Sequence, residues 1–236
     1  MDNNLIYQYY LPYSGPLKRD NTSIPDWAEL GVRSAKKYAS LIGVEYEFSD
    51  KIVINAPNQN LESARIFLDP KFDKYDKILL LDIDTLVATK KNIFDVQISD
   101  LGMIQDGGPG SPRSFINNIV SQLEAYGNIK FPNSVTFPSE KRYLNGGVQV
   151  WSKEGRLKAR DRFGGLAEMF RYRETLKMNE QPYINLMINL HDIEITEMPN
   201  MWNRMNYMWR MGIPDGYINH FLALHKKVMK DYAYGL

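Results

Sequence analysis

An aliphatic run ends in two aspartates in the stretch Lys77-Ile78-Leu79-Leu80-Leu81-Asp82-Ile83-Asp84-Thr85-Leu86-Val87. So short an apolar run predicts a strand that is buried on both faces. Because side chains at i and i+2 of a strand point the same way, Asp82 and Asp84 should project together from its end. Two neighbouring carboxylates repel each other and are costly to desolvate, and a divalent cation such as Mg²⁺ or Mn²⁺ removes that cost. The alternative is that both carboxylates cap a loop or pair with lysines.

The residues before Asp84 alternate between strand and helix patterns. Strands are predicted at Asn4 to Tyr10, Gly43 to Phe48 and Lys77 to Asp82. Apolar residues at helical spacing predict a helix at Trp27 to Leu41 and a short one at Leu61 to Leu68. The order β-α-β-α-β predicts a parallel sheet covered by helices, with ligands beyond the carboxyl ends of its strands. Tyr10 then lies where a nucleotide base could stack, although an ordinary loop aromatic would look the same.

The second half of the chain contains further short elements and no internal repeat or linker. In chain order we predict a strand at Leu101 to Gln105, a turn at Asp106 to Gly110, a helix at Ser114 to Tyr126, a loop entering a strand at Arg142 to Trp151, a helix at Lys153 to Tyr172 interrupted near Gly164-Gly165, a helix at Met178 to Leu190, a strand at Glu194 to Met198, a loop at Pro199 to Asn203, and a strand at Tyr217 to Phe221 before a polar tail. One continuous domain over residues 1–236 is the simplest interpretation.

Composition excludes several classes of protein. The net charge is +1, which gives no reason to expect nucleic acid as a partner. There is no cysteine, so disulfides and thiolate metal sites are excluded. The start of the chain lacks the pattern of a signal peptide, and no apolar run is long enough to span a membrane. We therefore expect a soluble, cytoplasmic protein with no integral membrane segment.

Three more motifs follow the aspartate pair. They are Asn145-Gly146-Gly147-Val148, Glu180-Gln181-Pro182-Tyr183-Ile184-Asn185, and His220 with Lys226 six residues later. Over roughly residues 60 to 226, their order and spacing resemble GT-A glycosyltransferases of family 8, the glycogenin and lipopolysaccharide galactosyltransferase family. The resemblance implies an α/β fold with a Rossmann-like, mixed, mostly parallel sheet flanked by helices. It also implies a nucleotide-binding half at about 1–105 and an acceptor half at about 106–236.

The resemblance further implies a metal-dependent hexosyltransferase. Asp82, Asp84 and His220 would hold the cation, and an imidazole beside carboxylates suits Mn²⁺ better than Mg²⁺. The donor would be a nucleotide-sugar, expected to be a UDP-sugar, and the acceptor a glycan, lipid or protein. Lys226 would neutralise the β-phosphate, and Arg65 would reach the diphosphate and sugar. Transfer is expected to retain the anomeric configuration.

The remaining family positions would handle the donor sugar. Asn145 and the Gly146 backbone would line it, Glu180 would bind its hydroxyls, and Gln181 would lie under the anomeric carbon. We name Glu180 and Gln181 as catalytic candidates, although a front-face mechanism would need no enzymic base. The chain departs from the family at Tyr7 to Pro12, which replaces its uridine pocket, so the base and the donor sugar are left open.

Each candidate residue also has a structural interpretation. His220 could be a satisfied buried histidine, Arg65 a surface ion-pair residue, Asn145 a turn residue and Lys226 a solvated tail charge. At the level of function, Leu80 to Asp84 also resembles the nucleophile strand of haloacid-dehalogenase-type phosphatases. The sequence is further compatible with a nucleotidyltransferase on a similar sheet and with an inactive sugar-nucleotide-binding protein.

Overall fold

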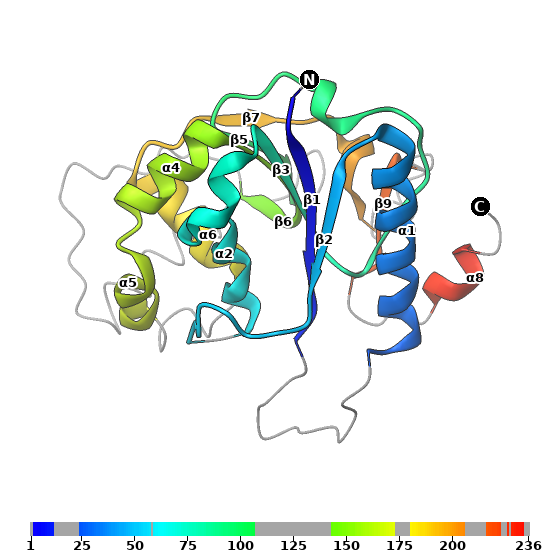
Figure 1. Cartoon of the computed structure of the whole chain (residues 1–236), viewed down its shortest axis with the longest axis horizontal. Helices are drawn as coiled ribbons and strands as arrows, with labels where there is room; N and C mark the ends of the chain where they lie inside the picture. Colours follow the sequence, from blue (N-terminus) through cyan, green and yellow to red (C-terminus); the bar gives the residue numbers. More distant parts are fainter. Residues whose placement is uncertain are drawn as a thin grey trace.

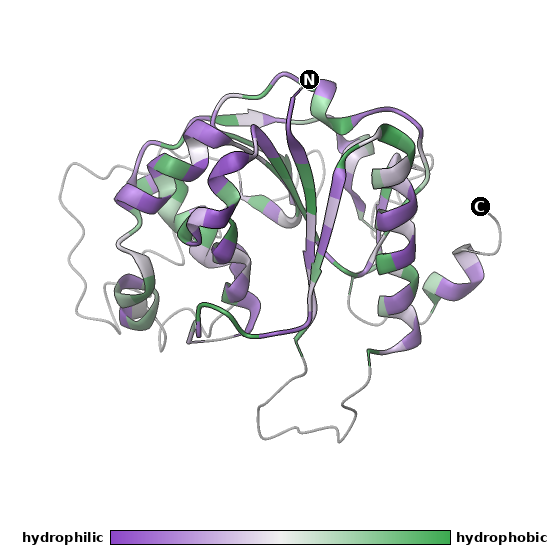
Figure 2. Ribbon diagram, viewed as in Figure 1, coloured by the Kyte–Doolittle hydropathy of each residue, from purple (hydrophilic) through white to green (hydrophobic). Residues whose placement is uncertain are grey.

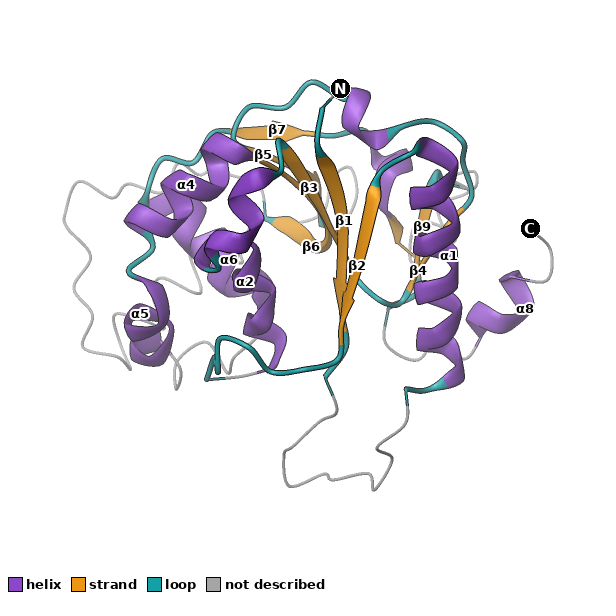
Figure 3. Cartoon of the chain, viewed as in Figure 1, coloured by secondary structure: helices purple, strands orange, loops and turns teal. Residues whose placement is uncertain are grey.

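The computed structural model describes residues 2–11, 24–57, 59–106, 143–172, 180–205, 216–222, 226 and 228–233. The described residues form a large sheet, a small sheet and flanking helices (Figures 1 and 3). In spatial order, the large sheet comprises β2 (Glu45–Ser49), β1 (Asn4–Tyr9), β3 (Lys77–Leu81), β6 (Leu144–Ser152), β5 (Leu101–Gln105) and β7 (Ile195–Glu197). The small sheet comprises β4 (Thr85–Val87), β9 (Ile218–His220) and β8 (Arg204–Met205).

Helices cover both faces of the large sheet. The α-helices are α1 (Asp26–Ile42), α2 (Arg65–Leu68), α4 (Lys153–Arg162), α5 (Gly165–Tyr172), α6 (Glu180–Leu190) and α8 (Met229–Ala233). Four 3₁₀ helices complete the described helical segments: η1 (Gln59–Ala64), η2 (Pro70–Lys74), η3 (Ile93–Asp95) and η4 (Asn200–Asn203). In Figure 1, α1 lies on one side of the sheet, and α2, α4 and α6 lie on the other.

The sheet is mixed and mostly parallel. Strand β6 runs antiparallel to β3 and to β5, while the β1–β2, β1–β3 and β5–β7 pairs are parallel. The predicted fold class is therefore confirmed. The helix predicted at Trp27 to Leu41 is also confirmed, because α1 begins at Asp26 and is capped by Gly43, whose φ of 72° is left-handed.

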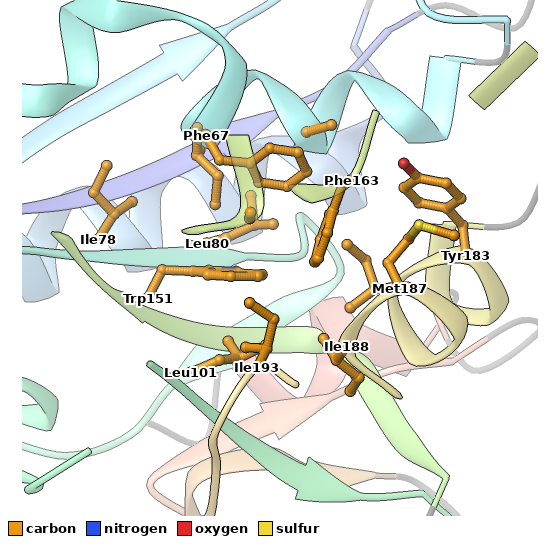
Figure 4. Packing of buried hydrophobic residues seen from close by; sticks show 14 of the residues in the cluster. Phe67, Ile78, Leu80, Leu101, Trp151, Phe163, Tyr183, Met187, Ile188 and Ile193 are labelled. Atoms are coloured by element: carbon orange, nitrogen blue, oxygen red, sulfur yellow. The ribbon is translucent and has the colours of Figure 1, made fainter. Parts of the chain in front are cut away.

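Strand β3 separates two hydrophobic clusters because its side chains alternate between the faces of the sheet. Ile78 and Leu80 pack with Trp151, Phe67 and residues of α6 on one face (Figure 4). Leu79 and Leu81 pack on the other face, against α1. In Figure 2, the central strands carry hydrophobic residues, whereas α1 shows both hydrophilic and hydrophobic residues. Burial on both faces explains why β3 is an uninterrupted aliphatic run.

The chain leaves the large sheet directly after β3. Asp82 to Asp84 form a turn, and β4 then pairs with β9 in the small sheet, with Thr85 opposite His220. The Thr85 hydroxyl closes the turn by donating to the Asp82 carbonyl at 2.7 Å. The small sheet therefore joins the aspartate pair to a histidine far along the sequence.

Several described segments differ from the sequence prediction, including the short elements β8, η2 and η3, which were not predicted. The strand β4 and the helix α8 were not predicted, because each is shorter than the periodicity that reveals an element. Pro199 to Asn203 is not a plain loop, since η4 begins at Asn200 and buries Trp202. Leu61 to Leu68 is a 3₁₀ turn followed by a four-residue α-helix.

The predicted interruption near Gly164 is confirmed, because α4 ends at Arg162 and α5 begins at Gly165. The predicted helix at Ser114 to Tyr126, and all but Asp106 of the turn at Asp106 to Gly110, lie outside the described residues. The division into a nucleotide-binding and an acceptor half stays a prediction.

We predict that Gly31→Ala destabilises the fold. A Cβ at this position of α1 would lie 1.8 Å from the carbonyl oxygen of Ile83, so helix and turn must move apart. Overpacking of this kind costs about 1–3 kcal/mol, and here the obstacle is backbone. The free energy of unfolding should fall by at least about that amount in urea titration. Ser40→Ala, at an exposed position of the same helix, should change it by no more than about 0.5 kcal/mol. Equal stability of the two variants would contradict this packing.

Candidate functional site

Two aspartates and a histidine meet where β3 ends. One ligand atom from each of Asp82, Asp84 and His220 lies within 4.8 Å of the other two. His220 Nε2 is 3.1 Å from Asp84 Oδ1 and 3.6 Å from Asp82 Oδ2. The sequence predicted that these three side chains come together, and the structure does bring them together.

The environment of His220 fits a metal ligand. Its side chain is almost fully buried, and its Nδ1 lies 3.0 Å from Asn203 Oδ1. Its Nε2 makes no well-directed hydrogen bond among the described residues, although it faces both carboxylates. A buried nitrogen aimed between two carboxylates is what a cation held by nitrogen and oxygen ligands requires. The three residues could therefore hold a divalent ion.

The three groups also shift one another's pKa values. Burial and the charge of Asp84 raise the pKa of Asp82 to about 6. Burial also opposes ionisation of Asp84, but the charges of His220 and Lys226 outweigh it and lower the pKa of Asp84 to about 2. Burial disfavours the charged imidazole as well, yet Asp84 and Asp82 prevail and raise the pKa of His220. Protonation and Lys226 thus offset the negative charge of the aspartate pair.

Lys226 closes the cluster from the C-terminal side. Its Nζ lies 2.8 Å from Asp84 Oδ2 and 4.6 Å from the centre of the Trp27 ring. The pairing of Lys226 with Asp84 matches the alternative that the carboxylates pair with lysines, and Trp27 is an additional partner. The role of Lys226 toward the β-phosphate stays a prediction.

A cleft of about 320 Å³ opens above the aspartates. Its lining residues are Tyr9, Tyr10, Leu11, Trp27, Gln59, Asn60, Asp82, Ile83, Asp84 and Lys226. The Tyr10 and Trp27 rings meet edge to face, with centroids 6.0 Å apart. The cleft therefore has aromatic side chains at one part of its wall and charged groups at another.

The proposed sugar-binding residues form a hydrogen-bonded group beside β6. Gln181 Oε1 accepts from the Gly146 N–H at 2.9 Å and from Asn145 Nδ2 at 3.1 Å. Gln149 Nε2 donates to Glu180 Oε1 at 2.6 Å. Burial and the negative charge of Asp82 raise the pKa of Glu180 to about 8. Glu180 and Asp82 therefore interact electrostatically, although their motifs are far apart in the sequence.

Arg65 has other contacts. Its guanidinium lies 3.1 Å from Asp69 Oδ2 and 3.6 Å from Glu47 Oε1, over the ring of Phe72. Its contacts with these residues match the ion-pair interpretation made from the sequence. A role toward the diphosphate stays a prediction.

Sequence analysis missed Asn203, Trp27 and Gly147 at this site. Asn203 was treated as part of a loop, and Trp27 as a helix residue. A Cβ on Gly147 would lie 2.1 Å from His220 Cε1, so this glycine makes room for the imidazole. For Gly147, the available sequence signal was the Asn-Gly-Gly-Val motif, because adjacent glycines permit another group to approach the backbone closely.

Comparison with known proteins identifies the fold. No family model and no curated protein matches the sequence. Solved structures do match: a glycosyltransferase involved in glycosylation of the major capsid of PBCV-1 is 13% identical, with a TM-score of 0.59 over 99% of this chain and 100% of that one. The galactosyltransferase LgtC, in complex with donor and acceptor sugar analogues, is 12% identical, with a TM-score of 0.56 over 98% and 96%. Mouse xyloside xylosyltransferase 1 is 12% identical, with a TM-score of 0.52 over 93% and 97%.

The chain therefore has the GT-A glycosyltransferase fold, as the motifs predicted. Among the described residues, no helix has the length and apolar character needed to cross a membrane.

We predict that Gly147→Ala weakens Mn²⁺ binding and Gly146→Ala does not. The added methyl of Gly147→Ala collides with the His220 ring, whereas that of Gly146→Ala would meet its nearest atom, Glu180 Oε2, at 3.4 Å. Displacing one of three ligands should raise the Kd for Mn²⁺ at least about tenfold. Electron paramagnetic resonance of free Mn²⁺ measures both variants, and circular dichroism checks that they are folded. Equal affinities would show that His220 is not a ligand.

Proposed function

We propose that this protein is a metal-dependent glycosyltransferase that moves a hexosyl group from a nucleotide-sugar, expected to be a UDP-sugar, to an acceptor. The observation that carries the proposal is the buried His220 Nε2, which faces Asp82 and Asp84 at the floor of a cleft. The GT-A fold, shared with glycosyltransferases over nearly their whole lengths, supports it. Retention of configuration belongs to the same proposal.

Asp82, Asp84 and His220 would hold the cation, with Mn²⁺ preferred over Mg²⁺ because of the imidazole. When bound, the cation supplies positive charge that stabilises the diphosphate as it leaves the sugar. Lys226 supplies a second positive charge at the mouth of the same cluster. As a point charge on a flexible stem, it can exchange the Asp84 carboxylate for a phosphate oxygen. Tyr10 and Trp27 offer aromatic surface for the base.

The geometry favours a positioning role for Gln181. Its oxygen already accepts two hydrogen bonds, from Gly146 and Asn145, so its lone pairs are held away from nucleophilic attack. Asn145 and the Gly146 backbone are ordered by the same contacts. This arrangement supports a front-face reaction, in which the departing phosphate oxygen takes the acceptor proton.

Glu180 acts as a neutral acid near pH 7 in this proposal. A carboxyl group whose pKa is raised to about 8 keeps its proton and can donate it in a hydrogen bond to a sugar hydroxyl. Gln149 fixes the other carboxyl oxygen.

A phosphatase and an inactive binding protein have less support. A phosphatase would use one aspartate as a nucleophile, whereas here both aspartates face a buried histidine. An inactive sugar-nucleotide-binding protein would use the same cleft and differs only in turnover. A glycan, a lipid or a protein can each be the acceptor, and the cytoplasmic location stays a prediction.

We predict that Asp84→Asn strongly slows donor turnover. The protein would be mixed with Mn²⁺ and UDP-, GDP- or dTDP-sugars, and release of nucleoside diphosphate would be followed. Loss of one carboxylate ligand should lower the rate by about two to three orders of magnitude. Asp161→Asn, an exposed position on α4, should leave it unchanged. No release of nucleoside diphosphate from any donor, together with no Mn²⁺-dependent UDP binding, would refute the proposal. Binding of UDP without release would favour the inactive binding protein.

We predict that kcat/KM for transfer falls at alkaline pH because Glu180 loses its proton. Burial raises the pKa of Glu180 above its ordinary value, so the group is protonated below the raised pKa, and its hydrogen bond to the sugar is lost as pH rises through it. Glu180→Gln stays neutral at every pH and should abolish this fall. The measurement is kcat/KM against pH for both proteins. If kcat/KM of Glu180→Gln falls at alkaline pH as it does in the wild type, another group causes the fall.

A further inference from the structure

Hydrogen bonds from the backbone fix the orientation of two buried amides beside the cluster. The Gly147 N–H donates to Asn145 at 2.9 Å, so the Asn145 atom at that position is the oxygen. Asn203 Nδ2 donates to the same oxygen at 2.8 Å. The other end of the Asn203 amide is therefore its oxygen, and this atom lies 3.0 Å from His220 Nδ1.

An amide oxygen can only accept a hydrogen bond. His220 Nδ1 must then carry a hydrogen and donate it to Asn203. In the neutral imidazole this leaves the lone pair on Nε2, the nitrogen that faces Asp82 and Asp84. A metal ligand needs this tautomer, because a protonated nitrogen cannot bind the ion.

We propose that Asn203 is a positioning residue that selects the Nδ1–H tautomer of His220 and so presents Nε2 to the metal. This inference rests on the metal dependence proposed above. Asn203 is fully buried and lies immediately before β8, which pairs with β9, the strand that carries His220. The backbone thus holds the amide and the imidazole in fixed register.

The same chain of hydrogen bonds continues to the donor-sugar residues. Asn145 Nδ2 donates to Gln181 Oε1, and Gln181 Nε2 donates to Asp106 Oδ2 at 2.6 Å. Each oxygen in the series receives an N–H from the backbone, an amide or the imidazole, and the series ends at the carboxylate of Asp106. A change at the sugar-binding glutamine can therefore reach the metal ligand through Asn145 and Asn203.

A purely structural role for Asn203 makes a different prediction from a positioning role. Asn203→Ala removes the acceptor for Nδ1–H, and the ring hydrogen should then move to Nε2, toward the carboxylates. Asn203→Asp keeps an acceptor for Nδ1–H but replaces the amide N–H that Asn203 donates to Asn145 Oδ1, so it separates loss of the acceptor from loss of the donor. Asn4→Ala is the matched control: Asn4 is a buried amide that accepts the Lys77 N–H at 3.1 Å, at the opposite end of β3.

The tautomer is measured by long-range ¹H–¹⁵N NMR of the metal-free full chain, at alkaline pH where the imidazole is neutral. The chain has only three histidines, and His220→Gln assigns the signal of His220. We expect Nδ1–H in the wild type, in Asn203→Asp and in Asn4→Ala, and Nε2–H in Asn203→Ala. Nδ1–H in Asn203→Ala, or Nε2–H in the wild type, would overturn the inference.

Titration with Mn²⁺ provides the second readout. We expect the Kd to rise about 10–100-fold in Asn203→Ala and to stay within a few-fold of wild type in Asn203→Asp and Asn4→Ala. Equal loss of affinity in Asn203→Ala and Asn203→Asp would indicate a structural role and overturn the proposal. A wild type that binds no Mn²⁺ would refute the metal dependence proposed above, and the tautomer spectra would still decide whether Asn203 controls His220.

Discussion

The pairing of β4 with β9 is the constraint on which the site depends. Strand β3 ends at two aspartates, but the histidine of the cluster comes from near the end of the chain. Thr85 opposite His220, with the Phe221 N–H donating to the Asp84 carbonyl at 2.9 Å, brings the two segments together through backbone hydrogen bonds. Backbone pairing therefore places His220 beside the two aspartates.

Bringing these groups together is electrostatically costly. Asp82 and Asp84 are negative and close, and Glu180 adds a further carboxyl group near Asp82. The raised pKa values of Asp82 and Glu180 favour their neutral forms, and Lys226 pairs with Asp84, which offsets this charge. Under the proposed function, a cation would take over the same task.

Sequence analysis predicted the elements whose signal lies in one continuous segment. The buried run of β3 and the apolar spacing of α1 both identify their elements without tertiary information. Strand β4 escaped because three residues carry no period, and its partner β9 is far away in the sequence. Sequence analysis also did not identify Asn203. The contribution of this residue depends on which amide atom faces His220, and residue spacing does not encode that orientation. Arg65 shows the converse limit, since its spacing matches a family pattern while its contacts are those of an ion pair.

Under the proposed function, Lys226 and His220 would link metal binding to donor binding. Both side chains lie against Asp84, so both would change partners if a cation took over the carboxylates. The cation would require an imidazole without a proton on Nε2, because a ligating imidazole is neutral. It would also release the Lys226 ammonium, and a diphosphate in the cleft would supply its new anion. Each ligand would then lower the free-energy cost of binding the other, and reciprocity requires the two effects to be equal.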